Sequence, residues 1–339
     1  MTKKQKMFQE KLIRHRQNLK THFRQASEFL VKCQIIKPYV EKGTLHGSVC
    51  PWEIGNSADE GAFPILEDFH DTLEAIWVWS YYTNAFREQS FQRNIEWAWE
   101  YIVNNWKRFI GKNESENKSL YDYSHILFSG TFYTKAFNDN RYEQLILQAG
   151  NRLENHLKKL KSTEGREYCD PFWMAHCLGL AAKTLKRQRW LKTAKTFVER
   201  SIVNKENPFS KAEREPRHKG LGGHDFFSKN ANKALASISC LNEETVEEML
   251  LKDFLPRLPS RFVSRHIDEN AWNAHLATAI GKAYILTSNE RFLSPYFAIM
   301  DELQKRDVQK FAALPRSPSF LRRESWVTFF YAHAYSSLA

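Results

Sequence analysis

The stretch DPFWMAHCLGLAAKTLK at residues 170–186 is apolar on nearly every side of the helix that its spacing predicts. A helix that is apolar all round is normally buried on all sides. A second stretch of this kind, at residues 322–338, includes Trp326 and Phe330. The two stretches therefore predict an inner layer of helices covered by an outer layer.

A repeat indicates how the two layers are connected. Several joints between predicted helices consist of a small residue, a polar turn and an aromatic residue that opens the next helix. These aromatic residues are Phe91, Tyr142, Trp190 and Phe292, at intervals close to fifty residues or to twice fifty. Such a period, with two helices per unit, is typical of helical-repeat proteins.

Each repeat has a first helix rich in small and aromatic residues, and these helices are expected at 66–85, 120–137, 170–186, 226–240, 268–287 and 321–338. The second helices carry more charge and are expected at 90–110, 141–160, 188–203, 243–254 and 289–305. The N-terminal helix near 7–35 is left over, and it can close a ring by packing beside the last inner helix. We therefore predict an all-α fold, an (α/α)6 toroid of helical hairpins that forms one domain over residues 1–339.

Loop lengths give the predicted ring a direction. The joints from a first helix to a second are short, whereas the joints back to the next first helix are long, so the long loops should lie on the face where inner helices begin. Long loops in a compact domain are often functional. We expect the loops 36–65 and 204–225 to lie over a cavity, and the basic, glycine-rich loop 204–225 to act as a lid or as a plain connector.

Composition limits the possible partners and compartments. The chain has 339 residues and a formal net charge of +11, which favours an anionic partner, although lysines and arginines spread over outer helices also explain it. The basic N-terminal helix is a candidate for contact with a polyanion or a membrane surface. There is no long apolar run or secretory signal, and the five cysteines lack a CxxC pair, so we expect a cytoplasmic protein.

Polar residues gather where the inner helices are expected to begin. Asp122, Asp170, Asp225 and Asp268 are each explained as helix caps, because Asp side chains bind the free N–H groups of a first turn. Capping does not explain the histidines and tryptophans one or two turns further on. If the ring closes, these residues line one polar, aromatic cavity.

The densest titratable cluster is Glu67-Asp68-Phe69-His70-Asp71. One carboxylate held near another, against aromatic walls, tends to keep its proton and can act as an acid. We expect Asp68 or Asp71 to be that acid, with His70 or His125 as its partner and Glu269 as a further catalytic candidate. The residues expected to bind a substrate are Trp77, Tyr123, Asp170, Trp173, His176, His224, Trp272, Asn273, Arg322, Arg323, Glu324 and Trp326.

Motifs for nucleotides, catalytic zinc and nucleophilic serine are missing from the sequence, so no cofactor is expected. A divalent metal has no supporting motif. Cys169 with Asp170 and a distant His224 has a spacing too unspecific to predict zinc.

The predicted architecture resembles that of the six-hairpin toroid enzymes, which include terpenoid cyclases, protein prenyltransferase β subunits, glycosidases and sugar epimerases. Within that group, Asp68-Phe69-His70-Asp71-Thr72 is similar to the Asp-x-Asp-Asp-Thr acid motif of class II terpenoid cyclases, with His70 in place of the proton-donating central aspartate. This resemblance implies acid or base chemistry in an aromatic cavity.

The leading hypothesis is a terpenoid-cyclase-like lyase or isomerase that acts on an isoprenoid, with arginines holding an anionic head group. One alternative is a glycoside hydrolase or sugar epimerase that acts on an acidic oligosaccharide, whose rings would stack on the same aromatic residues. A second alternative is a non-catalytic helical-repeat protein that binds a polyanion through its basic surface.

Overall fold

The computed structural model describes residues 3–57, 61–62, 64–110, 117–160, 170–209, 224–264, 267–320 and 322–339. Six inner helices are α2 (Phe69–Phe86), α4 (Asn117–Phe137), α6 (Pro171–Thr184), α8 (His224–Cys240), α10 (Glu269–Thr287) and α12 (Ser325–Ser336). Six outer helices are α1 (Lys3–Cys33), α3 (Gln92–Ile110), α5 (Glu143–Lys159), α7 (Gln188–Val198), α9 (Glu243–Met249) and α11 (Leu293–Arg306). Two short strands, β1 (Asn56–Ser57) and β2 (Gly61–Ala62), pair in antiparallel fashion.

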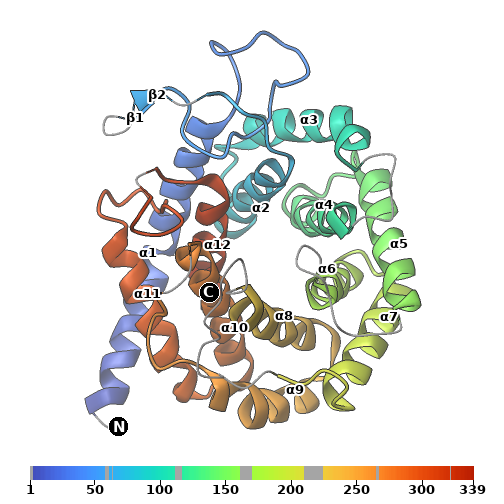
Figure 1. The fold of residues 1–339 in the computed structure, drawn as a ribbon, viewed down its shortest axis with the longest axis vertical. Coiled ribbons are helices and arrows are strands. Elements are labelled where there is room, and N and C mark those ends of the chain that lie inside the picture. The colour runs from blue at the N-terminus through green and yellow to red at the C-terminus, as the bar shows by residue number, and fades with distance from the viewer. Residues whose placement is uncertain are drawn as a thin grey trace.

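The inner helices form a closed ring. Each one packs against the next, and α12 packs against α2, so that the six surround a common centre (Figure 1). The outer helices α3, α5, α7, α9 and α11 each pack on the inner helix that precedes them, and α1 packs on α2 and α12. The predicted (α/α)6 toroid and its closure by the N-terminal helix are confirmed.

The ring closes through backbone and side-chain contacts at Ser325, the first residue of α12. Its amide donates to the Pro51 carbonyl at 2.9 Å, and its hydroxyl donates to the Cys50 carbonyl at 3.0 Å and contacts Asp71 of α2. The segment after α1 is thus fixed between the last inner helix and the first.

Several helix bounds differ from those expected, for local reasons. α2 begins at Phe69 rather than near 66, because the Asp68 side chain accepts from the Asp71 amide at 3.0 Å and caps the helix there. The predicted helices 188–203 and 243–254 are each in two parts, since α7 and α9 continue as π-helical turns at Glu199–Val203 and Leu250–Phe254. A 3-10 turn at Glu290–Phe292 precedes α11.

The repeated aromatic residues lie between the outer helices and the core. Trp190, which is 2% exposed, packs on Gly150 of α5, where an added Cβ would lie 2.3 Å from the indole ring. Phe91 and Phe292 are also buried. The repeat therefore marks the positions where consecutive outer helices pack together.

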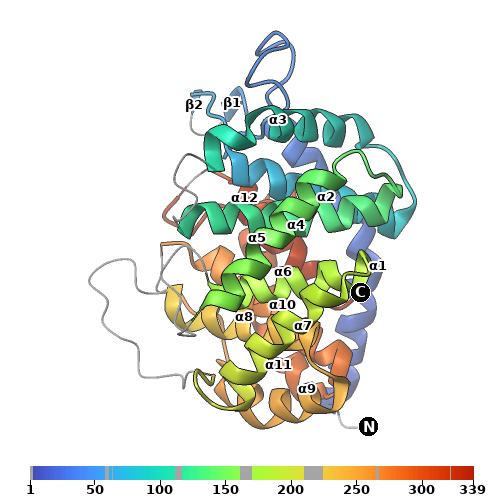
Figure 2. The same ribbon diagram turned by 90° about the vertical axis from the view of Figure 1, so that its right-hand side faces the viewer.

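The side view shows α1 running along one flank of the molecule (Figure 2). Three of its lysines are paired, Lys11 with Asp301 of α11, Lys20 with Glu88 and Lys32 with Glu53. Within the described ranges, no helix has the length and apolar character of a membrane span.

Candidate active site

The start of α2 is tied to α4 by a histidine and an aspartate. His70 Nδ1 lies 3.9 Å from the Asp68 carboxylate, and its Nε2 contacts the Asp122 carboxylate. Asp122 is fully buried and lies inside α4, because that helix begins at Asn117 and not near 120. It is therefore a partner of His70 and not the cap that it was expected to be.

A second pair joins the same two helices one turn further in. His125 Nδ1 donates to the Tyr121 carbonyl at 3.1 Å, which leaves its Nε2 unprotonated and 3.3 Å from Glu74. Burial raises the pKa of Glu74 well above its usual value and lowers the pKa of His125 to about 3. Burial thus disfavours the charged form of both groups, and His125 Nε2 has no hydrogen-bond partner among the described residues.

Asp71 is buried where α2 meets α12. Burial, and then the neighbouring charge of Asp68, raise the pKa of Asp71 well above its usual value, and the Asp71 amide donates to the Asp68 carboxylate at 3.0 Å. The expected pair of adjacent carboxyl groups is present. Asp71 is also part of the ring closure, because it contacts Ser325 of α12.

Three inner helices are joined by a relay of hydrogen bonds. The Asp170 carboxylate caps α6 by accepting from the Phe172 amide at 2.8 Å, and its other oxygen accepts from Asn232 Nδ2 of α8 at 3.0 Å. The Asn232 side-chain oxygen lies 2.7 Å from His275 Nε2 of α10. Because an amide oxygen only accepts, His275 carries its proton on Nε2, and Nδ1 keeps a lone pair.

His176 of α6 has the opposite tautomer. Its Nδ1 donates to the Leu235 carbonyl at 3.1 Å and lies 2.7 Å from the Ser239 hydroxyl, so its Nε2 keeps the lone pair. Burial lowers the pKa of His176 to about 3 and that of His275 to about 4. Both imidazoles are therefore neutral at physiological pH.

The two histidines lie against the same indole ring. The centroid of Trp173 is 5.3 Å from that of His176 and 5.8 Å from that of His275. A third buried histidine, His333 of α12, packs 4.8 Å from the ring of Trp77. The buried ring nitrogens without a hydrogen-bond partner in the described part of the chain include those of Trp77 (Nε1), Trp173 (Nε1), His176 (Nε2), His275 (Nδ1) and His333 (Nδ1).

Aromatic and charged side chains form a rim around the starts of α10 and α12. The rings of Trp272 and Trp326 are half-buried, with centroids 6.4 Å apart. Glu324 accepts from Arg316 at 2.7 Å and from Arg322 at 3.5 Å, and it contacts the Trp326 indole N–H. The predicted residues Trp272, Arg322, Glu324 and Trp326 are therefore brought together.

Other predicted residues have structural partners elsewhere. Glu269 pairs with Arg306 of the outer helix α11, and Asn273 bonds both backbone groups of Val263. Arg323 pairs with Glu53 at 3.0 Å on the side facing α1. Trp77 and Tyr123 are buried in the inner ring.

Some predictions fall on residues, or on side chains, that the structure does not describe. His224 is the first residue of α8, but its side chain is not described, and most of the predicted lid 204–225 and Cys169 lie in the gaps. In the described portion, no group of three His, Cys, Asp or Glu side chains is arranged to hold a metal ion.

Sequence reasoning missed Glu74, Asn232 and His333. A usable signal exists for His333, which follows Trp326 by seven residues and so lies on the same face of α12. The role of Asn232 depends on partners in two other helices and has no local signal.

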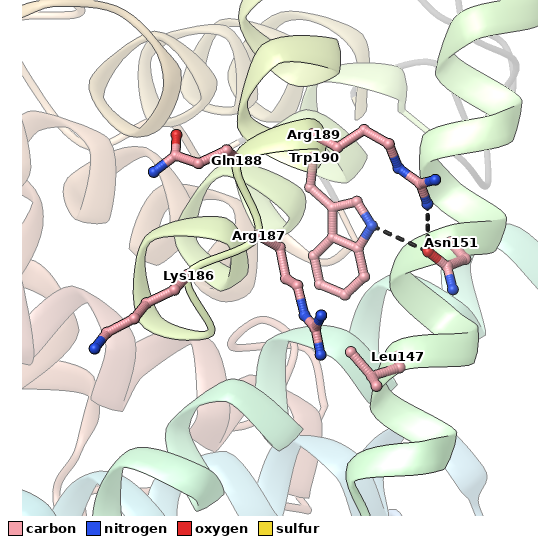
Figure 3. A pocket seen from close by; sticks show the side chains of 7 residues that line it. All are labelled: Leu147, Asn151, Lys186, Arg187, Gln188, Arg189 and Trp190. Atoms are coloured by element: carbon pink, nitrogen blue, oxygen red, sulfur yellow. Dashed lines mark hydrogen bonds between the residues drawn. The ribbon is translucent and has the colours of Figure 1, made fainter.

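A separate hollow lies on the outer wall, between α5 and α7 (Figure 3). It has a volume of about 400 Å³ and is lined by Leu147, Asn151, Lys186, Arg187, Gln188, Arg189 and Trp190. Its arginines are already engaged, since Arg189 bonds Asn151 at 3.0 Å and pairs with Glu154 at 2.8 Å, and Arg187 pairs with Glu143 at 3.5 Å. This hollow belongs to the outer helices and is separate from the histidines of the inner ring.

No protein-family model matches the chain, and no curated protein matches it in sequence. Solved structures do match. The α-1,6-mannanase GH76A from Salegentibacter sp. HEL1_6 has a TM-score of 0.61 at 9% identity, over 94% of this chain and 98% of the mannanase. The chain shares its fold with six-hairpin (α/α)6 enzymes.

Two further structures show the same likeness. Cellobiose 2-epimerase from Spirochaeta thermophila DSM 6192 has a TM-score of 0.62 at 10% identity, over 100% of this chain and 99% of the epimerase. An inactive variant of the mannanase, with two aspartates replaced by asparagine and α-1,6-mannotriose bound, has a TM-score of 0.60 at 8% identity, over 94% and 98% of the two chains. The likeness extends over the whole toroid.

Proposed function

We propose that the toroid interior catalyses epimerisation or isomerisation of a reducing sugar, by proton transfer at the carbon beside its carbonyl group. The observation that carries this proposal is the pair of neutral imidazoles, His176 and His275, each with a buried and unpartnered lone pair, against the same tryptophan ring. A neutral imidazole within reach of a C–H bond acidified by a carbonyl is suited to act as a general base.

The chemistry requires two proton transfers. One imidazole removes the C2 proton of the open-chain aldose, and the electron pair moves onto the carbonyl oxygen to form an enediolate. A proton taken from water by the opposite imidazole then returns to the other face of C2 and gives the epimer, while the first imidazolium releases its proton to water. Return of the proton to C1, together with transfer of the O2 hydroxyl proton to O1, gives the ketose.

The fixed tautomers support this division of roles. The Asp170–Asn232–His275 relay holds the His275 proton on Nε2, and the Leu235 carbonyl holds the His176 proton on Nδ1. Each imidazole therefore keeps its lone pair on the nitrogen that no other described group occupies. The cellobiose 2-epimerase with the same fold catalyses a reaction of this class, as its name states.

Glycoside hydrolysis is the second candidate, since the mannanase also has this fold. That reaction needs two carboxyl groups on either side of the glycosidic bond, roughly 5 to 9 Å apart. The Asp68 carboxylate accepts from the Asp71 amide, Asp71 contacts Ser325, and Asp170 is engaged by Asn232 and Phe172. These pairings favour a structural role for the carboxylates over hydrolysis.

The isoprenoid hypothesis has less support. His70 occupies the position of the proton-donating aspartate, and Asp122 and Asp68 already contact its two ring nitrogens. The three solved structures named above act on sugars or hold one, as their names state.

Solvent exchange tests the proposal. The protein is incubated in D₂O with D-glucose, D-mannose, cellobiose and α-1,6-mannotriose, and proton NMR follows the C2 proton. We expect deuterium at C2 together with epimer or ketose, and a fall in rate of about 100-fold or more in His176→Gln and His275→Gln.

A matched control is His156→Gln, on the outer helix α5, which should exchange at the wild-type rate. Release of mannose without C2 exchange would favour the hydrolase instead. Exchange at the wild-type rate in both site variants would remove the role of the two histidines.

A further inference from the structure

Lys282 of α10 has no counterion among the residues that the structure describes. It follows His275 by seven residues, which is two turns, so it lies on the same face of the helix. That face points to the ring centre, because His275 contacts Trp173 of α6 and Phe330 of α12. Lys282 is half-buried, and no hydrogen bond or ion pair joins it to another described residue.

The charges felt by Lys282 come from helices on different sides of the ring. Burial, and then the charge of Lys135 on α4, lower the pKa of Lys282. The Lys282 charge in turn contributes to lowering the pKa of His176 on α6 and of His333 on α12. An ammonium that is close to groups on α4, α6 and α12 lies in the interior of the toroid.

Acidic and basic residues occupy opposite ends of the inner helices. The acids within these helices, Asp71, Glu74, Asp122, Asp225 and Glu269, all lie in the first two turns. The second halves contain four lysines, Lys135, Lys183, Lys233 and Lys282, and no acid. Lys233 is bonded to the Asn207 side chain and to the Pro208 carbonyl. Exposed Lys135 and Lys183 are in or near the last turns of their helices, where the helix dipole favours a cation.

The helix dipole does not explain Lys282. It lies five residues before the end of α10 at Thr287, and it is partly withdrawn from water. A buried cation without a partner is unfavourable, so a structural role would call for a nearby carboxylate. An anion supplied by a ligand would provide the missing charge.

We propose that Lys282 binds an anionic group at the end of the substrate remote from its carbonyl carbon. The substrate class is then an acidic aldose, either a uronate or a sugar phosphate. This inference rests on the proposed function, since it takes the reacting carbon to lie beside His176 and His275.

The spacing fits a sugar of this size. Seven residues of helix separate the His275 and Lys282 backbones by about 10 Å, and a lysine side chain tilts back toward the helix N-terminus. An open-chain hexose spans about 6 Å at roughly 1.5 Å per bond. A C6 carboxylate or phosphate therefore reaches Lys282 while C2 lies beside the imidazoles.

The test compares D-glucuronate and D-glucose 6-phosphate with D-glucose, by C2 exchange in D₂O and by titration calorimetry. We expect at least one acidic sugar to have a KM or Kd lower than that of glucose by about 10- to 100-fold. The two acidic sugars distinguish a carboxylate from a phosphate. Lys282→Met should abolish this preference, and Lys282→Arg should retain it.

The control is Lys192→Met on the outer helix α7, which should keep the wild-type preference. Equal Kd values for acidic and neutral sugars, or a preference that survives in Lys282→Met, would overturn the inference. If glucose exchanges at C2 and no acidic sugar is preferred to it, this inference about Lys282 is wrong and the proposed function stands. If no sugar exchanges at C2, the proposed function is wrong, and the Kd values from calorimetry still test whether Lys282 binds the anionic group.

Discussion

Substitution of Asn232 by leucine tests the hydrogen-bond relay in the inner ring. Asn232 is 6% exposed and bonds Asp170 at 3.0 Å and His275 at 2.7 Å. Leucine leaves buried His275 and half-buried Asp170 without their bonds to Asn232, at about 1–3 kcal/mol each, so Asn232→Leu should lose about 2–6 kcal/mol of unfolding free energy. It also frees His275 to take the other tautomer, which should lower C2 exchange by about 100-fold or more.

Asn105→Leu separates loss of stability from loss of function. Asn105 is also 6% exposed, and it donates to the Thr44 and Tyr101 carbonyls at 3.1 and 2.9 Å, outside the inner ring. Urea unfolding should show a comparable loss of stability in both variants, with wild-type exchange in Asn105→Leu. If Asn232→Leu exchanges at the wild-type rate at a temperature where it is folded, the relay does not position the base.

Three further predictions concern the unfolding free energy measured in urea. Gly281→Ala should cost about 1–3 kcal/mol, because its Cβ would lie 1.9 Å from Oγ of Ser337, the residue that follows α12; an unchanged midpoint would argue against close packing of α10 on the end of α12. The pKa of His176 is 6.5 in the unfolded chain and about 3 in the folded protein, so the unfolded chain binds more protons as the pH falls. His176 alone should therefore lower the free energy of unfolding of the wild type by about 2 kcal/mol between pH 7 and pH 5. The His176→Gln variant should lack this part of the pH dependence. The pKa of Asp71 in the folded protein lies above its unfolded value of 3.8, so the contribution of Asp71 to the free energy of unfolding is lost as the pH rises. Asp71→Asn should therefore gain stability relative to the wild type between pH 5 and pH 7. A difference in stability between the two proteins that does not change with pH would contradict the burial of Asp71 as an acid.

Periodicity and loop lengths were sufficient to predict the architecture. An aromatic residue every fifty positions marks outer-helix packing, and Trp190 against Gly150 shows the reason. Composition of the inner stretches predicts their burial in the ring. The exact first residues of the helices were not predictable. For example, α2 begins at Phe69 because the Asp68 side chain caps it there.

The site was predicted less completely. The sequence indicates that polar residues gather at the starts of the inner helices, and Asp170 is a cap as expected. The hydrogen-bond partners of Asn232 were not predictable, since Asn232 is 62 positions from Asp170 and 43 from His275 in the sequence. Only the closed ring brings such distant side chains within bonding distance, and no local pattern reports them.

The positions of the imidazole protons are the central claim, and nitrogen-15 NMR of histidine-labelled protein measures them directly. Long-range proton–nitrogen spectra at pH 7, assigned with the His176→Gln and His275→Gln variants, report which ring nitrogen is protonated. We expect two neutral rings of opposite tautomer, with the proton of His176 on Nδ1 and that of His275 on Nε2. A doubly protonated ring at either position, or the reverse tautomers, would contradict it.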